Sequence, residues 1–175
     1  MSKPVLILVG PPGSGKSTVG RQVAHRLACD FKDFDDDLQA AHGLAAGELV
    51  VELGREHFQR LEVELLSTVL TDFDGVVALG GGTPTAPGAA ELLAGHRVVF
   101  LDVDLENLLK REGLVTLHPW LMPNPRAQLR QLLAERRPVY ESVATATVPT
   151  SGRDPEDVVA DVLRALRSAR NPTGA

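Results

Sequence analysis

The sequence has little cysteine, few aromatic residues and no excess of positive charge. Its one cysteine, Cys29, excludes an internal disulfide and fits a reducing cytoplasm. Aromatic residues make up 4% of the 175 residues, so aliphatic side chains must build the core. The net charge of −5 disfavours a general nucleic-acid binder or a binder of anionic membranes. We therefore expect a cytoplasmic protein with no nucleic-acid or membrane partner.

Long apolar runs are also missing. No stretch approaches the roughly 20 apolar residues that cross a membrane, and the run at residues 4–9 is too short for a signal peptide. The length favours one compact domain, which we place at residues 1–170, followed by a tail at 171–175. We expect this domain to be a monomer.

Short apolar runs and helical patterns alternate along the chain. Continuous apolar runs bounded by glycine or acidic residues predict strands buried on both faces. The alternation predicts an α/β fold, with a parallel sheet covered on both faces by helices. Ligands of such sheets bind at the carboxyl ends of the strands. The predicted strands are 4–9, 76–79, 97–102 and, more weakly, 30–34 and 144–148; the clearest predicted helices are 17–28, 48–71 and 155–168.

The first predicted strand leads into a complete phosphate-binding loop. Residues 10–17 read GPPGSGKS and match G-x-x-x-x-G-K-[ST] between a strand and a helix. Such loops turn backbone N–H groups toward phosphate oxygens, beside a helix N-terminus. Lys16 can reach the β- and γ-phosphates, and the Ser17 hydroxyl can ligate Mg²⁺. The expected ATP-binding residues here are Gly13, Ser14, Gly15, Lys16, Ser17 and Thr18.

Acidic residues end the second predicted strand, and glycines end the third. Alternate residues of a strand end share a side, so Asp33 and Asp35 are expected to point together. One carboxylate can hold a metal-bound water, and the other can accept the proton of an acceptor hydroxyl. Asp36 and Asp37 fit the first turn of a helix. The triplet Gly80, Gly81 and Gly82 lets backbone N–H groups approach a ligand closely.

With these motifs in place, the sequence resembles the shikimate kinases over about residues 4–166. The resemblance rests on GPPGSGKST, the pair Asp33 and Asp35 with Gly43, and the segments GREHFQRLE, DGVVALGGG, KREGLVTLHPWL and ERRPVY, in this order. It implies a nucleoside-monophosphate-kinase-like fold, with a three-layer αβα arrangement around a five-stranded parallel sheet. It also implies a mobile lid at about residues 112–124 and transfer of the ATP γ-phosphate to the 3-hydroxyl of shikimate.

The resemblance also implies roles for individual residues. Lys16 would act in catalysis, Ser17 and Asp33 would serve Mg²⁺, and Asp35 would contact the substrate hydroxyls as the base. Arg136 would pair with the substrate carboxylate. The other expected site residues are Gly80, Gly81 and Gly82 around the substrate, and Arg111, Arg153 and Pro155 around adenine.

The sequence departs from the family pattern at two arginine positions. Gln59 stands where the family has an arginine that grips the substrate carboxylate, and His118 replaces the lid arginine that reaches the transferring phosphate. Gln offers no charge, and histidine supplies charge only when it is protonated. Arg126 and Arg130, on the next predicted helix, are other possible sources of lid charge.

Three interpretations therefore stay open. The protein is a shikimate kinase with a compensated site, a related kinase with another hydroxylated acceptor, or a nucleotide-binding protein that transfers no phosphate. Trp120 in the lid slightly favours the second interpretation, since a large ring there could contact a different acceptor. The retained acids Asp33 and Asp35 argue against the third interpretation, because a binding protein needs no base.

Overall fold

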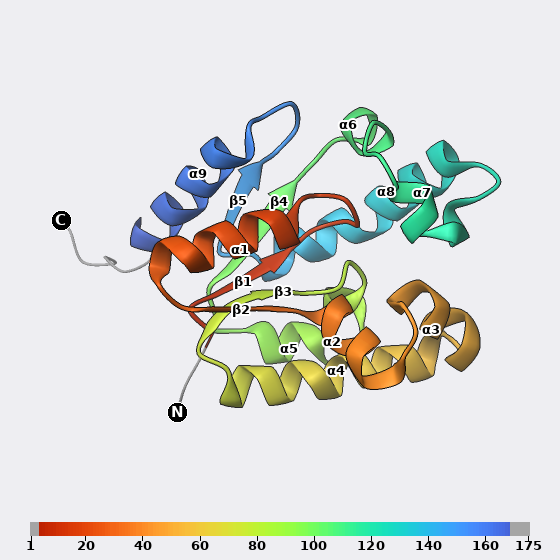
Figure 1. The fold of residues 1–175 in the computed structure, drawn as a ribbon, viewed down its shortest axis with the longest axis horizontal. Coiled ribbons are helices and arrows are strands. Elements are labelled where there is room, and N and C mark those ends of the chain that lie inside the picture. The colour runs from red at the N-terminus through yellow and green to blue at the C-terminus, as the bar shows by residue number, and fades with distance from the viewer. Residues whose placement is uncertain (1–3, 169–175) are drawn as a thin grey trace.

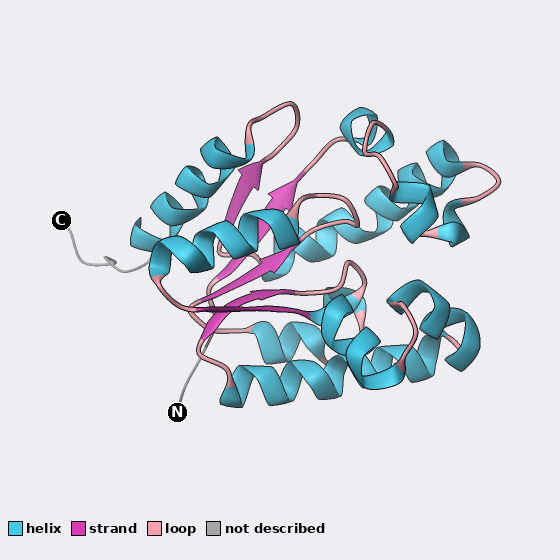
Figure 2. Cartoon of the chain, in the orientation of Figure 1, coloured by secondary structure: helices cyan, strands magenta, loops and turns pink. Residues whose placement is uncertain are grey.

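The computed structural model describes residues 4–168, and the predicted tail at 171–175 lies outside them. Five parallel strands form one sheet in the order β2-β3-β1-β4-β5, with helices on both faces (Figures 1 and 2). The predicted fold class is therefore confirmed. The strands are β1 (Leu6–Val9), β2 (Asp30–Asp33), β3 (Gly75–Ala78), β4 (Val98–Asp102) and β5 (Ala146–Pro149).

Helices connect the successive strands, in the alternation that the sequence predicts. All bounds follow chain order, and the two short 3-10 helices are labelled η. They are α1 (Lys16–Leu27), α2 (Phe34–His42), α3 (Ala46–Leu53), α4 (Arg55–Asp72), η1 (Thr83–Thr85), α5 (Ala89–Leu93), α6 (Leu105–Leu109), α7 (Leu114–Leu117), η2 (Pro119–Leu121), α8 (Pro125–Val143) and α9 (Pro155–Ser168).

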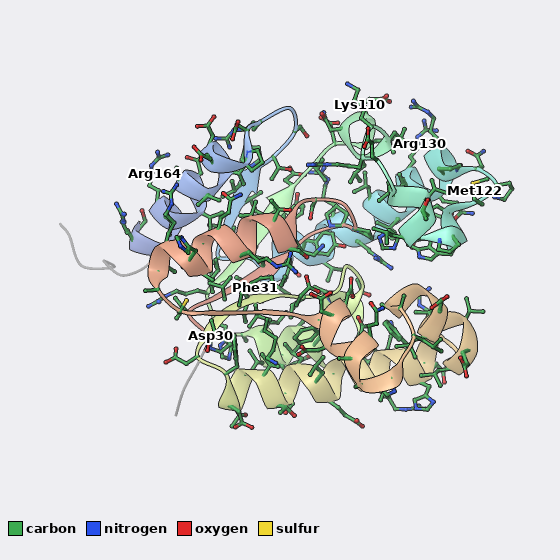
Figure 3. All side chains as sticks on the ribbon, in the orientation of Figure 1. Asp30, Phe31, Lys110, Met122, Arg130 and Arg164 are labelled. Atoms are coloured by element: carbon green, nitrogen blue, oxygen red, sulfur yellow. The ribbon has the colours of Figure 1, made fainter. Side chains whose placement is uncertain are left out.

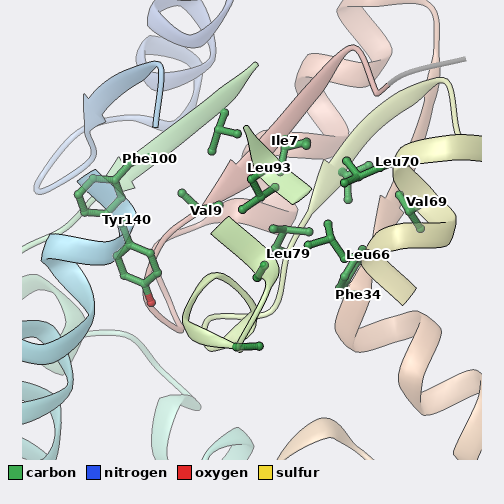
Figure 4. Packing of buried hydrophobic residues seen from close by; sticks show 14 residues of the cluster. Ile7, Val9, Phe34, Leu66, Val69, Leu70, Leu79, Leu93, Phe100 and Tyr140 are labelled. Atoms are coloured by element: carbon green, nitrogen blue, oxygen red, sulfur yellow. The ribbon is translucent and has the colours of Figure 1, made fainter. Parts of the chain in front are cut away.

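Alternation along the central strand builds a core on each side of the sheet. Ile7 and Val9 of β1 face a cluster that includes residues of α4, α5 and α8 (Figure 4). Leu6 and Leu8 face the other way, toward α1 and α9. Because successive strand residues point to opposite faces, a continuous apolar run is what a strand covered on both sides requires.

Two predicted elements differ from the structure. The predicted helix 48–71 is two helices, α3 and α4, because Gly54 between them has φ +81° and ψ 155°. The predicted strand 30–34 ends at Asp33, and Phe34 begins α2. Asp35 therefore lies in the first turn of a helix rather than at a strand end, so the expected strand alternation does not place it beside Asp33. Asp36 and Asp37 occupy that first turn, as predicted.

The expected lid segment contains two short helical elements, α7 and η2, rather than irregular chain alone. Leu114 and Leu121 from this segment are buried against Leu108 and Leu129, which belong to α6 and α8. The segment thus has a small apolar cluster of its own, separate from the two cores of the sheet. Within residues 4–168, no helix is long and apolar enough to cross a membrane.

Candidate active site

The phosphate-binding loop follows β1 at the centre of the sheet, and Lys16 begins α1. The Lys16 ammonium donates hydrogen bonds to the carbonyl oxygens of Gly10, at 2.8 Å, and Pro11, at 3.0 Å. Burial lowers the pKa of Lys16 to about 8, against the opposing charges of Asp35 and Asp33. The lysine side chain thus folds back over its own loop, where burial makes its charged form less favourable than in water. A bound polyphosphate would offer this ammonium charged partners in place of the two carbonyls.

Ser17 and Asp33 meet at the start of α1. The Ser17 hydroxyl donates to Asp33 Oδ2, and Asp33 Oδ1 accepts the backbone N–H of Asp35 at 2.9 Å. In the described residues, no three His, Cys, Asp or Glu side chains group as a metal site. Mg²⁺ that binds together with a nucleotide keeps several waters and takes few protein ligands beside phosphate oxygens. Ser17 and Asp33 are the residues that would hold it.

Asp35 and Glu62 flank the first glycine of the triplet. A Cβ placed on Gly80 would lie 3.3 Å from Asp35 Oδ1 and 3.0 Å from Glu62 Oε1. Burial raises the pKa of Asp35, and the Asp33 and Asp36 carboxylates raise it further, against the opposing charge of Lys16. Burial also raises the pKa of Glu62 to about 7, although Glu62 accepts a 2.6 Å hydrogen bond from the Thr83 hydroxyl. Two carboxyl groups with raised pKa values thus lie close to Gly80, just after the end of β3.

The glycine triplet is held between the phosphate loop and α8. A Cβ on Gly81 would come within 2.9 Å of Pro12 Cδ, so this close packing requires glycine. The Tyr140 hydroxyl donates to the Gly81 carbonyl oxygen at 2.6 Å. A Cβ on Gly82 would lie 3.4 Å from Arg136 Nη2. The triplet therefore fixes the phosphate loop, Tyr140 and the Arg136 guanidinium relative to one another.

The segment ERRPVY lies in the C-terminal half of α8 and makes three different contacts. Arg136 faces the triplet, and Tyr140 donates to it. Between them, Arg137 pairs with Asp102 at the end of β4, with Nη2 2.8 Å from Oδ1. Sequence reasoning assigned a role only to Arg136. The spacing of four residues between Arg136 and Tyr140 places both on one face of the helix, and this signal could have indicated the second residue.

One cavity of about 410 Å³ joins these groups. One wall comes from α3 and α4, and the other from the lid segment and α8. Expected site residues on its lining are Asp35, Gln59, Gly80, Gly81, Gly82, His118 and Arg136. The structure thus brings together the predicted substrate-binding positions. It adds two residues that the sequence reasoning did not assign, Arg55 and Glu62, both on α4.

The predicted adenine-side residues lie apart from this cavity lining. Arg111 packs beside the phosphate loop, because a Cβ on Gly13 would lie 3.7 Å from Arg111 Cγ. Arg153 donates to the Pro149 carbonyl oxygen at 2.8 Å and pairs with Asp161 at 2.9 Å. Pro155 begins α9. Thr18 is exposed on α1.

His118, in the expected lid segment, lines the cavity and is uncharged at neutral pH. Burial lowers the pKa of His118, and the positive charges of Lys16 and Arg136 lower it further. Its ring lies edge-on to Trp120, with the centroids 5.8 Å apart. Arg126 does not replace the missing lid charge, because it pairs with Glu106 at 2.6 Å. Arg130 is exposed, on the outer side of the molecule near Lys110 (Figure 3).

Restoring a lid arginine should raise the rate of phosphoryl transfer. We expect His118→Arg to increase kcat by about tenfold, because an arginine beside the transferring phosphate contributes ~10³-fold or more where its geometry is ideal. The control is His118→Gln, which should keep the wild-type rate at pH 8, since the imidazole is already uncharged there. Steady-state kinetics would contradict this reasoning if His118→Gln lost activity while His118→Arg gained none.

Comparison with known proteins gives the family. The family model described as shikimate kinase matches residues 12–167. The chain belongs to the shikimate kinase family. Its relatives include a shikimate kinase from Streptomyces coelicolor, 47% identical over 166 residues that cover 95% of this chain and 97% of the relative. Another from Thermobifida fusca is 44% identical over 168 residues, covering 96% of this chain and 98% of the relative.

Solved structures agree with this membership of the shikimate kinase family. The shikimate kinase from Acinetobacter baumannii, in complex with shikimate, has a TM-score of 0.89 at 31% identity, with 98% of this chain and 96% of that chain covered. A gluconokinase from Sinorhizobium meliloti has a TM-score of 0.58 at 19% identity, with 95% and 93% covered, and shares the fold only. The resemblance seen in the sequence motifs is therefore confirmed.

Proposed function

We propose that the protein transfers the γ-phosphate of ATP to the 3-hydroxyl of shikimate. The observation that carries the proposal is the position of Asp35. Its carboxylate flanks Gly80 in the cavity, and its pKa is raised although the charge of Lys16 in the phosphate loop lowers it. A base with a raised pKa, placed between a phosphate loop and an acceptor cavity, suits proton removal from an alcohol. Family membership and the shikimate-bound relative support shikimate as that alcohol.

In the proposed reaction, Asp35 accepts the proton of the acceptor hydroxyl as the oxygen attacks the γ-phosphorus. The bond from the γ-phosphorus to the bridging oxygen breaks, and ADP leaves with that electron pair. Throughout the transfer, Lys16 binds the phosphate oxygens, and Arg136 and the glycine triplet orient the acceptor. Mg²⁺, which Ser17 and Asp33 would hold, neutralises phosphate charge when it is bound. We also propose that the enzyme is cytoplasmic and monomeric, and that Arg111, Arg153 and Pro155 lie around adenine.

A second acceptor is favoured by one observation. Gln59 lines the cavity where the family carries an arginine, and Trp120 closes the lid side of the same cavity. A hydroxylated compound with a differently placed acid group, or with none, would then be phosphorylated. The test is ADP release by the purified protein with ATP, Mg²⁺ and a panel of shikimate, other hydroxylated acids and uncharged polyols. Turnover of a polyol but not of shikimate would replace the first proposal by the second.

The segment at residues 112–124 is proposed to be a lid that orders when ligands bind. The segment meets α3 at Gly47, where a Cβ would lie 3.6 Å from the Leu117 carbonyl oxygen and 3.9 Å from Trp120 Cδ1. The side chains of Val51 on α3 and Leu117 of α7 nevertheless stay 81% and 71% exposed. Closure excludes water from the transferring phosphate. We expect hydrogen exchange in this segment to slow when an ATP analogue and shikimate are added together. Exchange rates that do not change would count against a lid.

A further inference from the structure

The cavity-facing side of α4 carries an arginine, Arg55, that the resemblance to the family assigned no role. Four residues of this helix line the cavity, Arg55, Phe58, Gln59 and Glu62. Their spacing of three, four and seven residues puts them on one helical face. Arg55 thus lies one turn before Gln59, in the same stripe. Arg60 follows Gln59 directly, is exposed and is absent from the lining.

Arg55 has no acidic partner among the described residues, in contrast to five other arginines. Among residues 4–168, no hydrogen bond or ion pair is found for its guanidinium. Several others are bound to acids: Arg21 with Asp36, Arg126 with Glu106, Arg137 with Asp102, and both Arg153 and Arg164 with Asp161. A free guanidinium at the edge of a cavity can donate two parallel hydrogen bonds to a carboxylate without breaking an existing pair.

The charged side chains on the cavity lining indicate what Arg55 could bind. The cationic side chains on the lining are Arg55 and Arg136, since His118 is uncharged at neutral pH. The acids on the lining are Asp35, Glu62 and Glu135. Asp35 is the proposed base, Glu62 accepts a hydrogen bond from Thr83, and Glu135 accepts one from Gln131 at 3.0 Å. Arg55 is also the first residue of α4, where the helix dipole favours an anion. An acidic ligand would therefore meet positive charge from two sides.

We propose that Arg55 determines specificity for an acidic acceptor, by supplying the charged grip on its carboxylate that Gln59 lacks. Arg136 binds the carboxylate from the α8 side, and the Gln59 amide adds an uncharged hydrogen bond. The inference rests on the proposed function and narrows it: the acceptor is a hydroxylated carboxylate rather than an uncharged polyol. It also explains how a chain without the family's arginine at position 59 keeps an acid-binding site.

The test measures the dissociation constant of shikimate by calorimetry with Mg-ADP present, and so needs no turnover. We expect Arg55→Gln to weaken shikimate binding by about tenfold to over a hundredfold, the loss typical of a charge-assisted hydrogen bond. The matched control Arg60→Gln, on the same helix outside the cavity, should leave it unchanged. Arg55→Lys should restore part of the affinity. The double variant Arg55→Gln/Gln59→Arg should return it to about the wild-type value.

A second readout separates recognition from folding. In steady-state assays, Arg55→Gln should raise KM for shikimate with little change in kcat or in KM for ATP, a split that a general loss of structure does not produce. Equal shikimate affinity in wild type and Arg55→Gln would overturn the role of Arg55 even if shikimate is turned over. If wild type binds and phosphorylates another acid instead, shikimate is the wrong substrate, and loss of that acid's binding in Arg55→Gln still supports the role. Binding of polyols but of no acid would overturn both the assignment of shikimate as substrate and the role of Arg55.

Discussion

Replacing Asp35 by asparagine is expected to lower kcat by about 10²–10⁴-fold, while the dissociation constant of ATP stays within about twofold. The carboxylate flanks Gly80 at the acceptor cavity, and its pKa is raised. Asparagine keeps the size and shape of the side chain but cannot accept a proton. Single-turnover phosphoryl transfer and ATP titration on the same protein would separate the two effects.

The pH profile provides a further check on Asp35. Because its pKa is raised above that of an ordinary carboxyl, protonation as the pH falls removes the base at a higher pH than usual. The acid limb of kcat/KM should therefore lie above the ordinary carboxyl range in wild type. Asp36→Asn should keep a near-normal rate, because its carboxylate is exposed and pairs with Arg21, but should move the acid limb to lower pH, because the Asp36 charge contributes to the raised pKa of Asp35. A near-normal rate in Asp35→Asn would show that the base lies elsewhere.

Much of this fold could be predicted because the strongest motifs carry their own structural context. The phosphate loop has to follow a buried strand and begin a helix, so residues 10–17 placed β1 and α1 together. Continuous apolar runs then indicated strands covered on both faces. Since parallel strands all end at one edge, the acids after β2 and the glycines after β3 were expected to meet, and Asp35 does flank Gly80.

Local backbone conformation was harder to predict. The apolar pattern runs from α3 into α4 with little interruption, and only the φ of +81° at Gly54 separates them. A single glycine inside a helical pattern is often tolerated, so periodicity could not show the break. Likewise, Asp33 is both the last residue of β2 and the N-cap of α2, because its carboxylate accepts the N–H of Asp35. The two acids therefore sit in different elements.

The break at Gly54 also decides what the sequence could say about Arg55. As part of one long helix, Arg55 would be an ordinary charged residue on a solvated turn. Because the chain bends at Gly54, Arg55 becomes the first residue of α4, at the corner where α3 and α4 form one wall of the cavity. Its position thus depends on tertiary packing, which no spacing in the sequence specifies.

Lys16 is expected to make ATP binding depend on pH in the alkaline range. In the free protein its pKa is about 8, and the phosphates of bound ATP raise that pKa by adding negative charge beside the ammonium. Affinity is therefore constant below pH 8 and falls as the pH rises through 8, because binding must then take up a proton. We expect the dissociation constant of ATP to rise by about tenfold for each pH unit above 8, as one pKa unit corresponds to 1.36 kcal/mol.

The matched variants are Lys16→Met and Lys32→Met. At pH 7, Lys16→Met should weaken ATP binding by at least about 100-fold, because two charge-assisted hydrogen bonds to phosphate are lost, and its remaining affinity should no longer vary above pH 8. Lys32, which pairs with Asp37 at 2.9 Å outside the phosphate loop, should be replaceable with the wild-type pH dependence intact. Calorimetry at pH 9 in two buffers of different ionisation enthalpy would measure the proton uptake directly. Proton uptake that persists in Lys16→Met would show that another group takes up the proton. Lys16 would then be charged throughout this pH range, because the charges of Asp35 and Asp33 raise its pKa more than burial lowers it.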